Sequence, residues 1–306
     1  MSYETVTVGA GDTVSLRARP GDPIENVLID ISASGAGFNI RCSEGGSVIR
    51  NVGIAGHFDD PGNDSMFNLD VRDNVGEPML VENVHFEGYH EPVHARPGAK
   101  VWSHALHAGH ITFRNVTLAN LGDAGFYCSE SGLPPDSAHP NGYRAGNGTY
   151  RFENCHVTGC GTGHFRVTSD GSEIINSFAA DGRGANRGLY QQWGRDGATV
   201  YVRDSTIMDH SIDLSIGGSD WGVGNDIYTH VTDARWDSER LHSGSNDNGH
   251  IVGDGASAGA AAWLEPSDIG APSTPEQAAS GDVDYTPPDD PDDTTFDDPV
   301  CVRDLL

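Results

Sequence analysis

The chain lacks several features that would quickly assign it to a class of protein. It contains no apolar run of about 18 residues, so no membrane-spanning helix and no membrane insertion are expected. Its first residues, MSYETVTVGAGD, carry neither the basic and apolar regions of a secretion signal nor a twin-arginine pair. The five cysteines include no Cys-x-x-Cys pair, which argues against a disulfide framework or a zinc site. Reduced, buried thiols are expected instead.

Basic residues are scarce, and lysine is almost absent. Lys and Arg together number 18 against 45 of Asp plus Glu, which gives a formal net charge of −27, and Lys100 is the single lysine. This balance resembles that of proteins from halophilic archaea, because molar salt, with a Debye length of about 3 Å, screens the self-repulsion. An acidic mesophilic protein with a solvated surface is the alternative. With no basic patch to bind phosphates, nucleic acid is not an expected partner.

A short sequence pattern recurs, whereas helical periodicity is nearly absent. The pattern, apolar-x-Asn/Asp-x-x-apolar, is followed in each copy by a second short alternation that usually begins with Gly. Short strands of period two, repeated at this spacing, are typical of a solenoid. The anchor residues of six copies are Asn51, Asn83, Asn115, Asn154, Asn176 and Asp204, with spacings of 32, 32, 39, 22 and 28 residues.

Each anchor marks a bend in the predicted strand. In VIRNV, the inward residue Ile49 precedes Asn51 by two positions, but the next apolar residue, Val52, follows it by one. Such a slip in the alternation indicates that the chain turns a corner. Asn tolerates the left-handed backbone region, and its amide can bond the Asn of the repeat above or below. We therefore expect the anchors to stack as a ladder of hydrogen-bonded side chains.

These repeats resemble the right-handed parallel β-helix family, the pectin-lyase-like superfamily, from Tyr3 to Gly253. The resemblance implies an all-β fold: a right-handed single-stranded parallel β-helix with an extended acidic C-terminal tail. The expected division is N-terminal cap strands over residues 1–34, the β-helix over 35–252 and an acidic Pro/Asp-rich extended tail over 253–306. A β-sandwich with irregular hairpins is the alternative.

Many members of that family are polysaccharide lyases or glycoside hydrolases, but their signatures are missing from this chain. Asn-Thr-Asp, Gly-His-Gly and Arg-Ile-Lys do not occur in it, so no catalytic residue is assigned and the enzyme reading becomes the second choice. The loop residues Asp59, Asp60 and Asp64 are candidate ligands for Ca²⁺, against the alternative of a solvated acidic surface. No other cofactor is expected.

The outward positions of the Gly-led strands form a candidate glycan-binding stripe. The proposed binding residues are Tyr127, His164, Arg166, Tyr190 and Gln192. An aromatic ring can cover the apolar face of a pyranose while amides and guanidinium groups bond its hydroxyls. An ordinary exposed sheet is the alternative. Earlier repeats contribute Asn39, Arg41, Asn68, Asp70, Arg72, His94 and Arg96 to the same stripe.

Fold, charge and stripe together suggest a structural protein of a virus. The chain resembles spike, turret and tail-fibre proteins, which are assembled in the cytoplasm and need no export signal. We expect a component of the virion surface of a virus or provirus of a halophilic archaeon, binding a host glycan or glycoprotein. Other virion proteins and further copies of the chain are the expected partners. A polysaccharide lyase or hydrolase is the first alternative, and a scaffold without a ligand is the second.

The acidic composition predicts that stability depends on salt. Dialysis from molar NaCl to about 0.1 M should unfold the protein, because self-repulsion is then no longer screened over contact distances. Far-ultraviolet circular dichroism at a series of salt concentrations measures this. Equal stability at both concentrations would contradict the halophilic interpretation.

Overall fold

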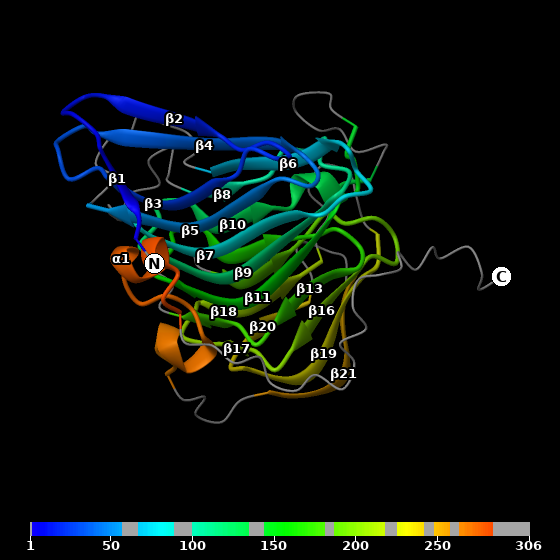
Figure 1. Cartoon of the computed structure of the whole chain (residues 1–306). Helices are drawn as coiled ribbons and strands as arrows, with labels where there is room; N and C mark the ends of the chain where they lie inside the picture. Colours follow the sequence, from blue (N-terminus) through cyan, green and yellow to red (C-terminus); the bar gives the residue numbers. More distant parts are fainter. Residues whose placement is uncertain are drawn as a thin grey trace.

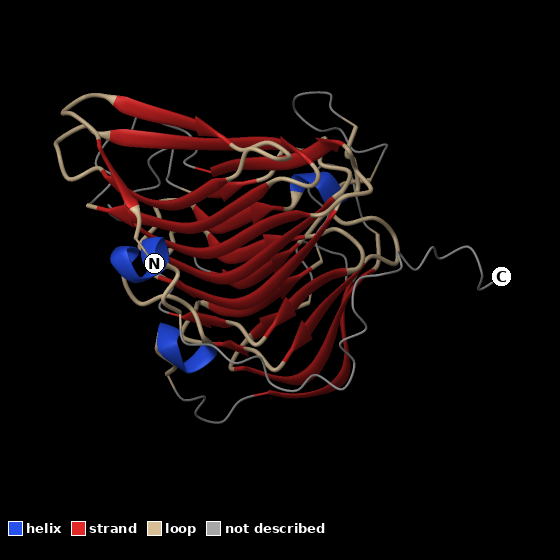
Figure 2. Ribbon diagram, in the orientation of Figure 1, coloured by secondary structure: helices blue, strands red, loops and turns tan. Residues whose placement is uncertain are grey.

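The computed structural model contains two large parallel β-sheets, and Figures 1 and 2 show their strands stacked one after another through the molecule. It describes residues 2–56, 67–88, 100–134, 144–180, 187–217, 225–241, 248–257 and 263–283. The first sheet contains β1 (Glu4–Thr7), β3 (Ile24–Asp30), β5 (Val48–Ala55), β7 (Met79–Glu87), β9 (His110–Ala119), β11 (Thr149–Thr158), β13 (Ser172–Ile175), β14 (Phe178–Ala180), β16 (Thr199–Arg203), β17 (Thr206–Ile207), β19 (Ile227–Trp236) and β21 (Gly249–Ser257). The second contains β2 (Thr13–Arg17), β4 (Gly37–Glu44), β6 (Phe67–Asp73), β8 (Val101–Trp102), β10 (Ala124–Cys128), β12 (Gly163–Val167), β15 (Arg187–Gln191), β18 (Ile212–Ile216) and β20 (Glu239–Arg240). The described helices are η1 (Glu130–Gly132), η3 (Pro266–Ile269) and α1 (Pro275–Ser280), and none is long and apolar enough to cross a membrane.

Successive strands alternate between the two sheets, except that β13 and β14, and likewise β16 and β17, both belong to the first sheet. The first sheet begins in the order β1-β3-β5-β7-β9-β11, and the second follows the order β2-β4-β6-β8-β10-β12-β15-β18-β20. The pairings between these neighbours are parallel. Parallel pairing requires the chain to cross over and return before it adds a strand to the same sheet. The expectation of an all-β fold with long parallel sheets is confirmed.

Near the C-terminal end, the first sheet closes into a ring of strand pairings. Strands β13 and β14 flank Asn176 and both pair with β11, whereas β16 and β17 flank Asp204 and both pair with β19. With the pairings of β13 to β16 and β14 to β17, six strands are connected in a closed circuit. The circuit arises because a corner residue divides one strand into two halves. Each half then pairs separately with strands of the neighbouring repeats.

Asparagine side chains join the repeats at their corners. Asn26, Asn51, Asn83, Asn115, Asn154 and Asn176 all have φ between 43° and 55°. From Asn51 onward, each Nδ2 donates to the Oδ1 of the preceding Asn at 2.8 to 3.0 Å. Asn suits these corners for two reasons. Its backbone tolerates the left-handed region, and its side chain carries both a hydrogen-bond donor and an acceptor.

Among the described residues, the ladder of side-chain hydrogen bonds ends at Asn176. Asp204 keeps the corner conformation, with φ of 49°, but a carboxylate has no hydrogen to donate to the Oδ1 of Asn176. The sequence expectation that Asp204 belongs to the ladder is therefore correct for the backbone bend and wrong for the hydrogen bond.

Inward-facing apolar side chains fill the space between the sheets. Phe113 and Phe152, register partners on β9 and β11, stack with ring centroids 5.3 Å apart. Phe126 and Phe165 stack in the same way on the second sheet, at 5.5 Å. The four described cysteines are free and buried in this region, as expected. Ile49, predicted to face inward, is fully buried, and the apolar residues at the inward positions of the other repeats are all at most 2% exposed: Ile54, Val81, Phe86, Phe113, Leu118, Phe152, Val157, Val202 and Ile207.

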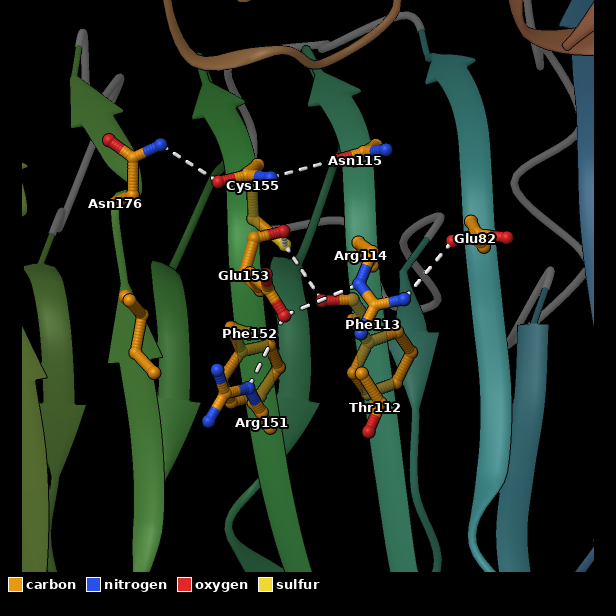
Figure 3. Close-up of polar contacts among 12 residues, drawn as sticks. Glu82, Thr112, Phe113, Arg114, Asn115, Arg151, Phe152, Glu153, Cys155 and Asn176 are labelled. Atoms are coloured by element: carbon orange, nitrogen blue, oxygen red, sulfur yellow. Dashed lines mark hydrogen bonds and ion pairs between the residues drawn. The ribbon is translucent and has the colours of Figure 1, made fainter. Parts of the chain in front are cut away.

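Acidic and basic residues alternate in one rank on the outer face of the first sheet. The register aligns Glu25, Arg50, Glu82, Arg114 and Glu153 on five neighbouring strands. Arg50 pairs with Glu25 at 2.8 Å, and Arg114 lies 3.3 Å from both Glu82 and Glu153 (Figure 3). Each arginine in this rank therefore meets a carboxylate, and the charges of the rank largely cancel.

Residues 263–283, the C-terminal strap, lie across the outer face of the first sheet. Trp263 packs edge-on against Phe178, with ring centroids 5.2 Å apart. The backbone oxygen of Leu264 accepts a hydrogen bond from His156 Nε2 at 2.8 Å, and that of Pro272 accepts one from Thr117 Oγ1 at 2.6 Å. The residues that receive the strap share one register rank: Gly53, His85, Thr117, His156 and Phe178.

Gly53 allows the strap to approach the sheet closely. A Cβ at this position would lie 1.9 Å from the backbone oxygen of Pro275, so any larger residue would displace α1. Thr274 caps the N-terminus of helix α1, because its hydroxyl accepts a hydrogen bond from the backbone N–H of Gln277 at 3.1 Å.

The described elements change the expected domain boundaries. The proposed cap strands of residues 1–34 already belong to the two sheets, since β1 pairs with β3 and β2 pairs with β4. Strand β21 crosses the expected boundary at residue 253. Residues 263–283 form helical turns packed on the sheet, so the expectation of an extended tail is wrong there; residues 284–306 lie outside the described ranges. The alternating pattern missed the strap because its contacts are made with residues far away in sequence.

The asparagine ladder predicts a stability difference between two corner residues. Asn115→Ala should lower the free energy of unfolding by about 3 kcal/mol, because it loses two ladder bonds and strains a left-handed backbone. Asn74→Ala is the control, since Asn74 has φ of 52° but is exposed and outside the ladder, and it should cost about 1 kcal/mol. Equal losses in urea unfolding would show that the ladder adds nothing beyond the backbone bend.

Docking of the strap should weaken in acid. Burial beside α1 lowers the pKa of His85 from 6.5 to about 4, and burial also lowers the pKa of His156. Both residues bind protons more readily when the strap is released, so the stabilisation present above pH 6.5 is lost as the pH falls towards 4. Hydrogen exchange of residues 263–283, corrected for intrinsic rates, should rise over this window.

The variant His85→Gln removes one of the two titrating groups and should flatten the pH dependence of that exchange. Exchange of the strap that is unchanged from pH 7 to pH 4.5 in the wild-type protein would contradict the prediction.

Candidate functional site

One register rank crosses all nine strands of the second sheet and defines the candidate site. Its members face outward, because they alternate with core residues such as Phe126 and Phe165. We call this row the second-sheet rank. In order from β2 to β20 it consists of Arg17, Arg41, Asn68, Trp102, Tyr127, Arg166, Tyr190, Ser215 and Arg240.

Access to the second-sheet rank differs along its length. Arg17 and Arg41 are exposed, and Asn68, Trp102 and Tyr127 are half-buried. Farther along, Tyr190 is only 9% exposed. Arg240 at the other end is exposed again, so the longest accessible stretch of the rank runs from β2 to β10.

Aromatic rings surround Arg166 at the centre of the rank. Its guanidinium carbon lies 3.9 Å from the ring centroid of Tyr127, 5.0 Å from that of Tyr190 and 5.2 Å from that of Trp193. Arg187 lies 4.4 Å from the centroid of Tyr190. These are cation–π distances, and the rings hold Arg166 in place without neutralising its charge. On the first sheet, in contrast, Arg50 and Arg114 are paired with glutamates.

Trp193 adopts a strained backbone conformation beside this cluster. Its φ is 64°, which is rare for a bulky residue, and its side chain is 7% exposed. Its ring meets that of Tyr190 edge-on, with centroids 5.5 Å apart. Positive φ at a large side chain costs free energy and tends to occur at functional sites.

A half-buried ion pair lies next to Tyr127. Lys100 Nζ is 2.8 Å from Asp123 Oδ2, and Thr162 Oγ1 donates to Asp123 Oδ1 at 2.8 Å. Burial alone would raise the pKa of Asp123, but the charge and hydrogen bond of Lys100 lower the pKa overall. The carboxylate is therefore ionised and already occupied, and Lys100 also lies 5.3 Å from the ring centroid of Tyr127.

Two residues of the predicted glycan-binding set lie beneath the surface. His164 is fully buried, and its Nδ1 lies 2.9 Å from His210 Nε2; His210 Nδ1 in turn lies 3.0 Å from Asp213 Oδ1. Burial lowers the pKa of His164, which keeps it neutral. Gln192 is 4% exposed, and its Nε2 donates to Ser215 Oγ at 3.0 Å. Alternation correctly placed Tyr127, Arg166 and Tyr190 in one row, but it could not show which outward side chains other loops cover.

Trp102 is a member of the rank that the sequence pattern did not indicate. Strand β8 is only two residues long, so it carries no alternation that a pattern search could detect. His94 and Arg96, the residues predicted for that repeat, both lie outside the described ranges.

The predicted Ca²⁺ ligands belong to one aspartate loop. Asp59, Asp60 and Asp64 lie outside the described residues. Within the ranges that the structure describes, no group of three His, Cys, Asp or Glu side chains is arranged to hold a metal ion.

The comparisons with known proteins leave the fold and the site as the only guides to function. No family model, no curated protein and no solved structure matches the chain.

Proposed function

We propose that this chain is a right-handed parallel β-helix that binds glycan along the second-sheet rank. Alternation of strands between two parallel sheets supports the fold, because about 98% of crossovers between parallel strands of one sheet are right-handed. The hydrogen-bonded asparagine corners support it as well, since they are the feature on which the resemblance to the pectin-lyase-like family rests.

The observation that carries the functional proposal is the continuity of the second-sheet rank. Neighbouring strands are about 4.8 Å apart, so an amide, an indole and a phenol follow one another at short, even intervals from Asn68 to Tyr127. A polysaccharide laid along the rank would therefore meet either a hydrogen-bonding side chain or an aromatic ring on each strand. Trp102 would cover the apolar face of one sugar, and Asn68 and Arg41 would bond hydroxyls on its neighbours.

The inner half of the rank has a different role in this proposal. Arg166 occupies one face of the Tyr127 ring at 3.9 Å, so a sugar would use the ring edge and the hydroxyl of Tyr127. Tyr190 and Trp193 hold Arg166 in position rather than contact the ligand. His164 and Gln192, both buried, likewise support the site from below.

We further propose that the glycan belongs to a host cell surface and that the chain is part of the virion surface of a virus of a halophilic archaeon. The formal charge of −27 and the predominance of aspartate support this setting. Recovery of the chain with purified particles from an infected halophilic culture would support it, whereas recovery only as free protein would contradict it.

Substitution of Trp102 tests the glycan proposal. Trp102→Ala should weaken retention on host cell-surface polysaccharide at least about tenfold in molar KCl, because one stacking contact is lost. Tyr228→Ala is the matched control: Tyr228 is also half-buried and aromatic, but it lies on the first sheet, and its loss should leave retention unchanged.

Affinity electrophoresis in gels containing the polysaccharide measures both variants, after circular dichroism has shown that they are folded. Equal retention of the two variants and the wild type would contradict binding at the rank. Release of soluble oligosaccharides, detected by mass spectrometry, would instead identify a polysaccharide-cleaving enzyme.

A further inference from the structure

A hollow lined by arginine opens at the exposed end of the second-sheet rank. Its volume is about 210 Å³, and its lining includes Arg17, Arg41 and Arg72 together with Asn68 and Asp70. Arg17, Arg41 and Asn68 are consecutive members of the rank, whereas Asp70 and Arg72 follow Asn68 at every second position along β6. Three strands thus supply one guanidinium each to the same small space.

The carboxylates around this hollow do not cancel its three positive charges. Asp70 is 1% exposed and pairs with Arg72, and Glu44 lies 3.6 Å from Arg17. Arg41 instead donates from Nε to the amide oxygen of Asn39 at 2.9 Å. No carboxylate of the described residues lies within 4.0 Å of the Arg41 guanidinium. Local positive charge is conspicuous in a chain with 18 basic and 45 acidic residues.

We propose that this hollow binds a sulfate ester carried by the polysaccharide that lies along the rank. The inference rests on the proposed function and names the chemical class of its ligand. A sulfate ester presents three terminal oxygens, which matches guanidinium groups arriving from three strands and the amide of Asn68. A carboxylate presents two oxygens and would satisfy fewer of these donors.

The position of the hollow relates the sulfate to the stacked sugar. Trp102 follows Asn68 in the register, so the indole lies one strand beyond the wall of the hollow. A sugar stacked on Trp102 would therefore be the immediate neighbour of a sulfated unit. Arg41 would make the decisive contact, because Arg17 and Arg72 each also serve a carboxylate.

Three polysaccharides with one backbone separate the anion from the sugar. Dextran, carboxymethyl dextran and dextran sulfate differ only in the group attached, and affinity electrophoresis in molar KCl compares them. The wild-type protein should bind dextran sulfate at least about tenfold more tightly than carboxymethyl dextran of equal substitution. Arg41→Gln should remove that preference, because retention on dextran sulfate should fall by a larger factor than retention on carboxymethyl dextran or unsubstituted dextran.

Arg50→Gln is the control for the loss of one positive charge, because Arg50 is an exposed arginine on the first sheet, 46% exposed and paired with Glu25. Its preference for dextran sulfate should equal that of the wild type. Equal binding of carboxymethyl dextran and dextran sulfate, or an equal loss in both variants, would overturn the sulfate site. If Trp102→Ala loses retention but Arg41→Gln keeps the preference for dextran sulfate, the glycan proposal stands and the sulfate site is rejected. Failure of the sulfate site can therefore be distinguished from failure of the proposed function.

Discussion

The asparagine corner is the constraint on which the rest of this structure depends. At each corner the backbone enters the left-handed region, the strand bends, and one amide donates to the corner of the preceding repeat. Because the same residue sets both the bend and the alignment between repeats, the strands from Asn26 to Asn176 are held in register with the strand one repeat earlier. The rows of aligned side chains inside and outside the sheets are consequences of that register.

The register produces opposite electrostatic results on the two outer faces. On the first sheet, Arg50 and Arg114 lie between glutamates, and the charges largely cancel. On the second sheet, Arg166 lies among aromatic rings and Arg41 has an amide partner, so the positive charge persists. A face with uncompensated cations and half-buried rings is suited to a polar ligand, whereas a face of compensated pairs is not.

The C-terminal strap uses the first sheet in a further way. It covers a register rank of that sheet that contains a glycine, a threonine and two histidines. Hydrogen bonds from Thr117 and His156 to strap carbonyls satisfy polar groups that burial would otherwise leave without a partner. The strap thereby completes the outer surface of the first sheet and leaves the second sheet to carry the proposed site.

The sequence by itself determined the strand class, the inward residues and the corner positions, because these follow from period-two alternation and from the backbone tolerance of Asn. It also placed Tyr127, Arg166 and Tyr190 in one row. Only the tertiary structure decided that His164 and Gln192 are buried, that Trp102 belongs to the rank and that residues 263–283 fold back on the sheet. These features depend on contacts between residues more than 20 positions apart, and local patterns of polarity carry no information about which distant segment covers a side chain.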